Sequence, residues 1–565
     1  MEIHTDKVNN SMSVYDIHTM LPSSSVIRLL TRFGPAVLAV LLAMVLRWPI
    51  SLYADALPRD PNTALHMIIA ADVAQTGDLL HLTRLDFPEA LSIRVVAIPV
   101  VLLAALLGQV LSPVVAFNLA GTVWVAAQGF AMDRLGAAWG WSVAGRATAV
   151  TAAVVSPFAL LALGNGQLEN ISVLPLCLVA WGAGRRHWAT GVGLLLAAFC
   201  SPYQAIVAGI LAISCALPKG WAAVRSTLLV AMLAAAPVVA YYGSQAAPEN
   251  LQDDPVATLA LQRTRPAPPM GVIGARVDGL VLPRAHENTQ SLPRRSPLER
   301  LSAARYAPSW NDPGGLWPIE EVTVAGWLGV VALIGGLIGV WRRRRDPRVR
   351  GVALAALLCL VLAVGDRLRI SEEIILPIPM PWAVADALDG PLAAMEATWR
   401  FLSGVTFLLA VGLGFGVQRV RFAAVLCVAL LAETLLFAPG AWPVPASALR
   451  VSRLEPLLPP GPIAVWPGLP VVSTFRHALL SLALDRPVAT FNGQPESQEV
   501  LDGYRPTVPE VDLQGRDVQA WLAAVQAAGV VAIVELTDVP SEYQLPMDTK
   551  PDAAFDSFRF YRLRH

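Results

Sequence analysis

Charged residues are scarce in this sequence. Only 15% of its 565 residues are Asp, Glu, Lys or Arg, whereas soluble domains carry about 25%. Hydrophobic residues make up 55% of the chain, and the mean hydropathy is +0.54. Apolar runs of roughly 20 residues, long enough to cross a bilayer as helices, recur along the chain. This composition excludes an ordinary soluble domain and predicts a mainly α, polytopic membrane protein.

A basic surplus is also absent, because Lys and Arg balance Asp and Glu and the net charge is zero. Nucleic acid is therefore excluded as a partner, since nothing would neutralise its phosphates. Most apolar segments contain no charged residue, which argues against a proton-coupled pump. The cysteines lack metal-ligand spacing and lie in apolar segments, so we expect small core residues at Cys177, Cys200, Cys215, Cys359 and Cys427.

Familiar catalytic motifs are missing as well. The chain contains no Walker loop, no dinucleotide-binding glycine pattern between a strand and a helix, and no His-Glu-x-x-His. It also has no Gly-x-Ser-x-Gly elbow to present a nucleophile. A functional site is therefore sought among the polar residues beside the membrane segments, where ionisable groups are costly and usually serve a function.

The chain divides into a polar N-terminal stretch, a long apolar region and a C-terminal region described below. Residues 1–32 are polar and predict a cytoplasmic tail, and residues 33–438 hold the apolar segments. The first segment, Phe33–Tyr53, lacks a small-residue cleavage site and predicts a signal anchor. We expect about eleven or twelve membrane segments in all. The later ones lie near 95–111, 114–132, 147–163, 171–183, 189–217, 226–242, 322–340, 352–364, 401–417 and 422–437.

Lys and Arg in short loops predict the orientation. The run Arg342–Arg345 is interpreted as the strongest cytoplasmic topology signal. The outward parts are then the loops 54–92, 164–170, 243–321 and 366–400, together with everything after residue 439. A parity conflict remains, because a full span at 95–111 would put Arg134 on the outside. Either that segment is re-entrant or interfacial, or one positive loop breaks the rule.

The region 443–565 has a different texture and predicts a small extracytoplasmic α/β domain of ordinary size. Ile463–Trp466 and Val530–Glu535 have the pattern of buried strands, and Phe558–Leu563 alternates like a final strand. Asp517–Ala528 has helical spacing. The loop 243–321, rich in Pro, Arg and Asn, predicts irregular or partly disordered chain over the membrane face.

The first outward loop concentrates carboxylates and imidazoles. Asp55 and Asp60 follow the first segment, and His66 begins a stretch with an apolar side that predicts an amphipathic interfacial helix. This stretch and the chain after it also contain Asp72, Asp78, His81 and Asp86. A carboxylate here could act as a general base towards a hydroxyl, or hold a cation near a pyrophosphate. The alternative is a set of solvated residues on a surface helix.

Two further outward segments are candidates. The loop Gly164–Asn170 combines glycine with the polar residues Asn165, Gln167 and Glu169, so its chain could approach a ligand closely. A plain turn would use similar residues. Arg400, after a Pro-rich stretch at the mouth of a span, could pair with a phosphate through its planar fork. It could also be an ordinary helix-end anchor.

Together these segments resemble the GT-C superfamily of membrane glycosyltransferases. The resemblance is closest to the YfhO-like and dolichyl-phosphate-mannose-mannosyltransferase-like bacterial membrane proteins, which also tend to carry a small C-terminal extracytoplasmic α/β domain. It is carried by the acidic loop with Asp60 and His66, by Phe87-Pro88-Glu89, Ala116–Leu119, Ser156-Pro157 and Gly166–Glu169, and by the lead into Trp399-Arg400-Phe401.

The resemblance implies transfer of a sugar from a polyprenyl-phosphate-linked donor to a glycan, lipid or protein acceptor on the outer face of the cytoplasmic membrane. An acid of the first outward loop would then serve as base, with Asp60 the first choice and Asp55 the second. Ala56 stands where many members have a second acid, and Glu169 could replace it.

An anionic leaving group favours a nearby cation, and Arg400, Arg59 or Arg94 could provide it. A divalent cation is left open. Two other classes compete with glycosyl transfer. One is a lipid or polymer transporter whose outer loops gate a passage. The other is a non-catalytic envelope assembly protein that binds through its C-terminal domain, with 491–495 as a binding loop.

Overall fold

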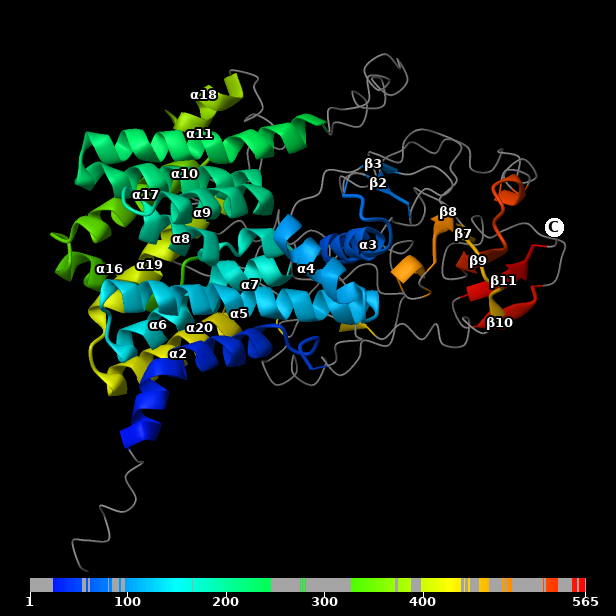
Figure 1. The fold of residues 1–565 in the computed structure, drawn as a ribbon, viewed down its shortest axis with the longest axis horizontal. Coiled ribbons are helices and arrows are strands. Elements are labelled where there is room, and N and C mark those ends of the chain that lie inside the picture. The colour runs from blue at the N-terminus through cyan, green and yellow to red at the C-terminus, as the bar shows by residue number, and fades with distance from the viewer. Residues whose placement is uncertain are drawn as a thin grey trace, which may run out of the picture.

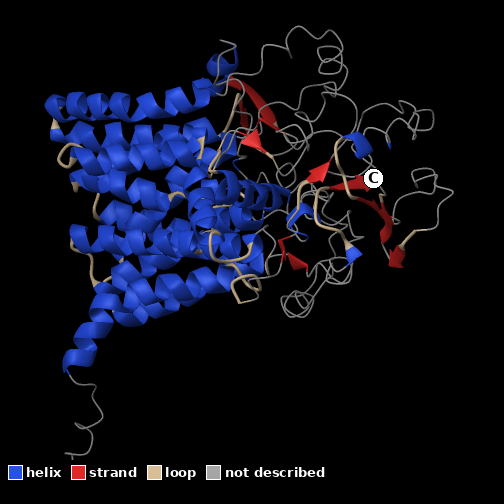
Figure 2. Cartoon of the chain, turned by 45° about the vertical axis from the view of Figure 1, so that its right-hand side comes forward, coloured by secondary structure: helices blue, strands red, loops and turns tan. Residues whose placement is uncertain are grey.

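Parallel and antiparallel helices form a bundle, and short strands gather beyond one of its ends (Figures 1 and 2). The structure is a computed structural model. It describes residues 24–52, 57–58, 61–79, 81–83, 91–92, 97–164, 166–244, 275, 277, 280, 327–370, 374–387, 398–437, 442, 446–447, 457–466, 480–482, 484, 486–489, 522, 525–536, 551–555 and 558–563.

The helices of the bundle follow the apolar runs of the sequence. Up to residue 244 they are α2 (Ser24–Leu46), α3 (Pro61–Thr76), α4 (Ile98–Gly108), α5 (Pro113–Trp139), α6 (Val143–Val154), α7 (Pro157–Gly164), η1 (Leu168–Asn170), α8 (Val173–Gly182), α9 (His187–Cys200), α10 (Pro202–Ala216), η2 (Leu217–Lys219) and α11 (Trp221–Ser244). After it come α16 (Val330–Arg342), α17 (Pro347–Ala363), α18 (Pro381–Ala387), η6 (Thr398–Phe401), α19 (Leu402–Gly416) and α20 (Val420–Phe437).

Several of these helices meet the requirements of a membrane span. Within the described residues, 4 helices are long and apolar enough by themselves, at 113–139, 202–219, 221–241 and 398–416. The pair α6 and α7, bent by 40° at its break, makes a fifth candidate. Shorter apolar helices such as α8, α9 and α16 stand beside them. The predicted mainly helical, polytopic membrane fold is confirmed.

Side-chain caps mark where the helices begin. The Ser142 hydroxyl accepts the Gly145 N–H at 3.0 Å at the start of α6, and the Ser201 hydroxyl accepts the Gln204 N–H at 3.4 Å at the start of α10. Such oxygens satisfy N–H groups that have no partner within the helix. Proline follows the cap of α10, where its missing N–H costs nothing. The break in the apolar run at Ser201 is therefore a true helix boundary.

Glycines allow α16 and α19 to pack against each other at close range. A Cβ atom at Gly339 would overlap the Gly412 carbonyl, and one at Gly336 would lie 2.8 Å from the Leu409 Cα. Gly416 continues the same line on α19. Membrane helices associate through such small residues because lipid supplies no hydrophobic drive between them.

Basic turns far apart in sequence meet at one end of the bundle, here called the basic end. Arg146 at the start of α6 pairs with the buried Asp133 of α5 at 2.6 Å. The Ser142 hydroxyl donates to the Val417 carbonyl at 3.0 Å, and Arg348 donates to the Trp139 carbonyl at 3.2 Å. The turns after α5, α16 and α19 therefore share this end.

The helix α4 removes the parity conflict of the sequence. It has 11 residues, so it extends only about 16 Å in a hydrocarbon layer of about 30 Å. It packs against α3, α5 and α9 rather than running the length of the bundle. The short α4 agrees with the re-entrant or interfacial alternative, and α5, which contains Arg134, ends at the basic end with Trp139.

The helix α3 differs from the predicted amphipathic interfacial helix. All residues from Met67 to Val73 are buried, including Asp72. The helices α4 and α5 pack on it, and Thr83 from the following chain donates its N–H and hydroxyl to the Asp72 carboxylate at 2.9 and 2.6 Å. Other segments of the same protein cover the side of α3 that the sequence pattern left for solvent. The prediction of a surface helix is therefore wrong.

The longest described sheet belongs to the C-terminal region and has the order β10-β11-β9-β7-β8. Its strands are β7 (Ile463–Trp466), β8 (Val488–Ala489), β9 (Ala532–Leu536), β10 (Ala553–Phe555) and β11 (Phe558–Arg562). β7 is parallel to β8 and β9, while β11 is antiparallel to β9 and β10. The predicted strands at 463–466, 530–535 and 558–563 are present as β7, β9 and β11.

Besides this sheet, the described residues form three two-stranded pairs. They are β1 (Leu57–Pro58) with β6 (Ala446–Ser447), β2 (His81–Leu82) with β3 (Leu91–Ser92), and β4 (Arg367–Arg369) with β5 (Ile375–Pro379). The first pair joins the chain after α2 to the chain after α20. The first outward loop is thereby attached to the C-terminal region.

The close contact of α16 with α19 yields the first prediction. Gly339→Leu should destabilise the protein by about 1–3 kcal/mol or more, because the added side chain meets a backbone carbonyl that cannot move aside. Thermal unfolding of the purified protein in detergent measures this. Gly209→Ala is the matched control, since a Cβ there meets nothing within 4 Å. Equal thermal midpoints for the two variants would contradict the packing described.

Candidate functional site

The junction of α9 and α10, Cys200–Gln204, brings two of the predicted site segments together. Both η1, which holds Glu169, and η6, which holds Arg400, contact α10. These segments are more than 200 residues apart in sequence. The junction lies at the end of α9 away from Arg185 and Arg186, which belong to the turn before it.

The loop predicted at Gly164–Asn170 is a buried, tied turn rather than an open one. The Trp124 indole of α5 donates to the Leu168 and Ile171 carbonyls, each at 3.2 Å. The Asn170 amide donates to Gln167 Oε1 at 2.9 Å. Gly166 has φ of +68°, a conformation that favours glycine. The turn is therefore rigid, and it holds the Glu169 side chain at 5% exposure.

Glu169 lies in the turn η1, which contacts α10. The helix α10 begins two residues after Cys200, the last residue of α9. The Cys200 carbonyl accepts the Ala97 N–H at 3.0 Å, which ties the start of α4 to the same place. The chain that leaves the first outward loop therefore reaches the neighbourhood of Glu169.

Arg400 lies on the other side of the junction. Its guanidinium carbon is 5.1 Å from the centroid of the Tyr203 ring, an arrangement typical of a cation–π contact. Tyr203 in turn packs edge-on against Phe401, with ring centroids 5.6 Å apart. The Ser403 hydroxyl donates to Gln204 Oε1 at 3.1 Å and fastens α19 to α10. Arg400 is thus positioned by packing and is not a loose helix-end anchor.

Buried donors surround Arg400. The indole N–H groups of Trp382 and Trp399 and the amide nitrogen of Gln204 are buried and have no hydrogen-bond acceptor among the residues that the structure describes. Trp382 packs on Phe401 with ring centroids 5.4 Å apart. Buried donors without acceptors cost free energy, so a region rich in them suits a ligand rich in oxygen. Sequence reasoning treated Ser201–Gln204 only as an interruption and missed this contribution.

His66 occupies a buried position on α3. Its ring stacks on Phe117 of α5 with centroids 6.4 Å apart and an interplanar angle of 23°. Its Nδ1 atom has no hydrogen-bond partner within the described part of the chain. Burial lowers the pKa of His66 from 6.5 to about 4. The imidazole is therefore neutral near pH 7 and can donate or accept a hydrogen bond without carrying charge.

A second cation lies near Phe117 that the sequence reasoning did not select. Arg47, just after α2, is 4% exposed, and its Nε donates to the Thr122 hydroxyl at 3.2 Å. Its guanidinium lies over Gly121, where a Cβ would be 2.8 Å from the Arg47 Cζ. The only sequence signal was a single arginine inside the first apolar run, Phe33–Tyr53.

Several predicted site residues lie outside the described residues: Asp55, Arg59, Asp60, Asp86, Arg94 and Asn165, together with the loop 491–495. Asp60 directly precedes Pro61, the first residue of α3, and Asp55 and Arg59 flank the chain around β1. Asp72 is described and holds Thr83, so its role is structural. In the described part of the chain, no group of three or more His, Cys, Asp or Glu side chains could hold a metal ion.

The fold and the site define a polytopic helical membrane protein with a small mixed sheet and a polar site at one end of the bundle. No protein-family model matches the chain. No curated protein matches it either.

Two solved structures align with most of this chain at low sequence identity. The arabinofuranosyltransferase AftD from Mycobacteria has a TM-score of 0.46 and 15% identity, over 90% of this chain and 35% of that one. The oligosaccharyltransferase of Archaeoglobus fulgidus in its apo form has a TM-score of 0.42 and 10% identity, over 91% of this chain and 70% of that one. This chain thus spans about a third of the length of the arabinofuranosyltransferase.

The buried His66 predicts a loss of stability in acid. The unfolded chain binds a proton at the imidazole near pH 6.5, whereas the folded protein does so only near pH 4. Stability is therefore unaffected by His66 above pH 6.5 and falls by about 3 kcal/mol as the pH drops from 6.5 to 4. Thermal midpoints of the purified protein across this range measure the effect.

His66→Gln should flatten this part of the pH profile, because the titrating group is gone. His187→Gln removes an exposed histidine at the start of α9 and should leave the profile as it is. An acid dependence of the His66→Gln midpoint equal to that of the wild type would show that other groups cause it.

Proposed function

We propose that the protein is a GT-C-type membrane glycosyltransferase that moves a sugar from a polyprenyl-phosphate-linked donor to an acceptor at the outer face of the cytoplasmic membrane. The meeting of a buried carboxylate and a packed arginine at the α9–α10 junction carries the proposal. The turn η1, which holds Glu169, contacts α10, and the Arg400 guanidinium lies over Tyr203 at the start of the same helix. Acid and cation are the two groups that this transfer needs.

Arg400 is suited to the phosphate of the donor. A guanidinium offers a planar fork that matches phosphate oxygens, and a developing negative charge on the leaving group favours a fixed cation. The indole N–H groups of Trp399, the neighbouring residue, and of Trp382, which packs on Phe401, are further buried donors. The ring centroids of Tyr203 and Trp399 lie 5.1 and 6.0 Å from the Arg400 guanidinium carbon and hold it in place.

A carboxylate takes the proton of the acceptor hydroxyl as the new glycosidic bond forms and the bond from the sugar to the phosphate breaks. Asp60 remains the first candidate for this base because it directly precedes α3, and Asp55 is the second. Glu169 is the candidate for the second acid. The neutral His66, on α3 itself, is suited to orient a hydroxyl rather than to carry charge.

The positions of buried charges favour a site at one end over a path through the membrane. Asp133 is paired with Arg146 at the basic end, and Glu169 lies in a turn between helices. Arg47 follows the last residue of α2. A proton-coupled transporter would need such groups at mid-depth in the bundle. Their concentration at helix ends supports an interfacial reaction with a lipid-tailed substrate.

Further parts of the proposal concern location and partners. The basic end would face the cytoplasm, and the sheet of β7–β11 would lie outside the cytoplasmic membrane. The acceptor would be a glycan, lipid or protein, and a divalent cation could accompany the phosphate. A YfhO-like or dolichyl-phosphate-mannose-mannosyltransferase-like character remains a prediction.

Neutralising the catalytic carboxylate should lower kcat by about 10²–10⁴-fold, because the acceptor proton then has no base. Asp60→Asn, Asp55→Asn and Glu169→Gln would be compared in a reconstituted transfer assay with polyprenyl-phosphate-linked sugar. Asp72→Asn is the control, since this acid holds Thr83 and should affect the thermal midpoint more than kcat. Full activity in the three test variants at normal protein levels would refute the proposed catalytic role.

Arg400 should control donor binding. Arg400→Gln removes the charge and should raise the KM for the lipid-linked donor by at least about tenfold, as expected for loss of a charge-assisted hydrogen bond. Arg400→Lys keeps the charge but loses the planar fork, so its KM for the donor should lie between those of the wild type and Arg400→Gln. Arg367→Gln, at an exposed arginine of β4, provides the control. An unchanged donor KM in Arg400→Gln would place the phosphate elsewhere.

A further inference from the structure

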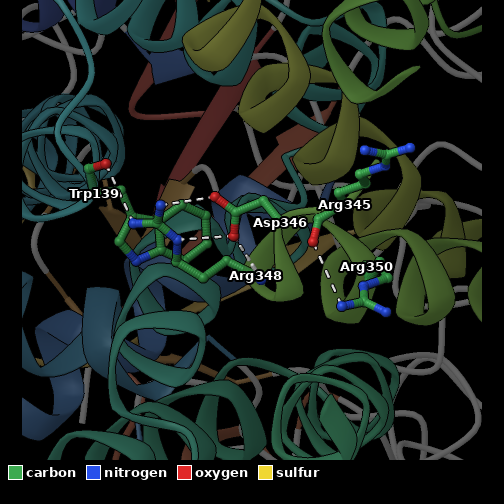
Figure 3. A network of polar contacts seen from close by, with 5 residues as sticks. All are labelled: Trp139, Arg345, Asp346, Arg348 and Arg350. Carbon is green, nitrogen blue, oxygen red and sulfur yellow. Dashed lines mark hydrogen bonds and ion pairs between the residues drawn. The ribbon is translucent and has the colours of Figure 1, made fainter. Parts of the chain in front are cut away.

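The turn between α16 and α17 carries more positive charge than its one carboxylate can balance. Residues 341–350 contain six arginines and a single acid, Asp346. Asp346 accepts the side chain of Arg348 at 3.0 and 2.7 Å and its backbone N–H at 2.9 Å (Figure 3). Partial burial raises the pKa of Asp346, but these hydrogen bonds outweigh it and lower the pKa overall.

The Arg348 side chain is held by contacts within the protein. It also donates to the Trp139 carbonyl at 3.2 Å (Figure 3). Its guanidinium packs over the Trp139 and Phe415 rings. The other five arginines of this turn make no ion pair with a carboxylate among the described residues. All five are exposed: Arg342, Arg343, Arg344, Arg345 and Arg350.

Some of these exposed arginines are already held in place. Arg344 donates to the Trp341 carbonyl at 3.2 Å, and its guanidinium carbon lies 4.4 Å from the centroid of the Trp341 ring. Arg350 donates to the Arg345 carbonyl at 3.4 Å, so these two side chains start from neighbouring positions (Figure 3). Several exposed arginines in one turn concentrate positive charge there, which favours a bound anion.

Exposed apolar side chains run from this turn along both helices. On α16 they recur at the spacing of one helix face, while Gly336 and Gly339 on another face pack against α19. The exposed set on α16 is Ile334, Leu337, Ile338 and Trp341. On α17 the exposed set is Leu354, Leu357 and Leu358, and Arg350 lies one turn before Leu354 on the same face.

We propose that the α16–α17 turn is a binding site for an anionic phospholipid. Arg344, Arg345 and Arg350 hold the headgroup phosphate, and an acyl chain lies along the exposed apolar face of α16 or α17. The apolar faces select a lipid over a soluble phosphate or a nucleic acid, because only a lipid fills both parts of the surface. Basic residues at the end of a membrane helix are a recognised attraction for anionic lipids. The proposal is independent of the proposed transfer reaction.

The experiment compares lipid binding by the full-length protein in nanodiscs of phosphatidylcholine, alone or with about a quarter phosphatidylglycerol. Native mass spectrometry of the released protein counts the retained lipids, and the thermal midpoint reports on folding. The test variant is Arg344→Gln/Arg350→Gln. The matched control is Arg185→Gln/Arg186→Gln, which removes two exposed arginines from another turn of the chain.

The wild type should retain phosphatidylglycerol in preference to phosphatidylcholine. The test variant should bind phosphatidylglycerol on the order of tenfold more weakly, because it loses two of the phosphate contacts, whereas the control should keep most of its affinity. Equal losses in both variants would show a diffuse surface-charge effect and overturn the site. Displacement of the lipid by millimolar inorganic phosphate would overturn the role of the acyl chain.

A second variant keeps the proposal testable if the double substitution fails to fold. Trp341→Ala removes the ring beneath Arg344 and leaves the net charge unchanged. It should also weaken phosphatidylglycerol retention, because Arg344 is no longer held towards the headgroup. Wild-type retention in Trp341→Ala, together with a normal thermal midpoint, would count against the geometry proposed.

Discussion

The close packing of α19 against its neighbours is the constraint on which both ends of the molecule depend. In lipid, helices gain little from burying apolar surface against one another, so close backbone contact and hydrogen bonds between helices must hold them. Gly412 meets Gly339 on α16, and α19 also packs on α6 and α17. Within the Thr398–Gly416 span, 83% of the most apolar stretch is buried inside the protein. A bulkier residue along this contact would separate the helices that carry the site.

The two ends of this helix serve different surfaces. At its start, Ser403 bonds Gln204 and Arg400 lies over Tyr203, so the helix sets the distance between η6 and the α9–α10 junction. At its other end, Val417 accepts the Ser142 hydroxyl and Phe415 packs against Trp141 with ring centroids 5.3 Å apart. Burial of α19 therefore positions the candidate active site and the basic end at the same time.

Burial also explains why the same kinds of charged residue have different roles. Asp72 and Asp133 are both buried acids, yet each is held by a close partner, Thr83 and Arg146 respectively. Burying a charge is costly unless it is paired and hydrogen-bonded, so such pairs are structural by default. Glu169 is buried in a turn held by an indole from another helix. Its turn contacts α10, the helix over whose first residues Arg400 lies, and this shared position makes Glu169 a candidate for chemistry.

Composition and pattern alone determined the class of the protein. The low charge and long apolar runs required a helical membrane protein, since backbone N–H and C=O groups in lipid must be satisfied within each helix. The strand patterns at Ile463–Trp466 and Phe558–Leu563 were likewise local, and both strands are present. Tertiary structure decided what local pattern cannot carry. It showed that α4 is too short to span, that α3 is covered on all sides from Met67 to Val73, and that Glu169 and Arg400 reach one junction. Each of these depends on contacts between residues far apart in sequence. The spacing of apolar residues within one segment does not indicate which other segments pack against it.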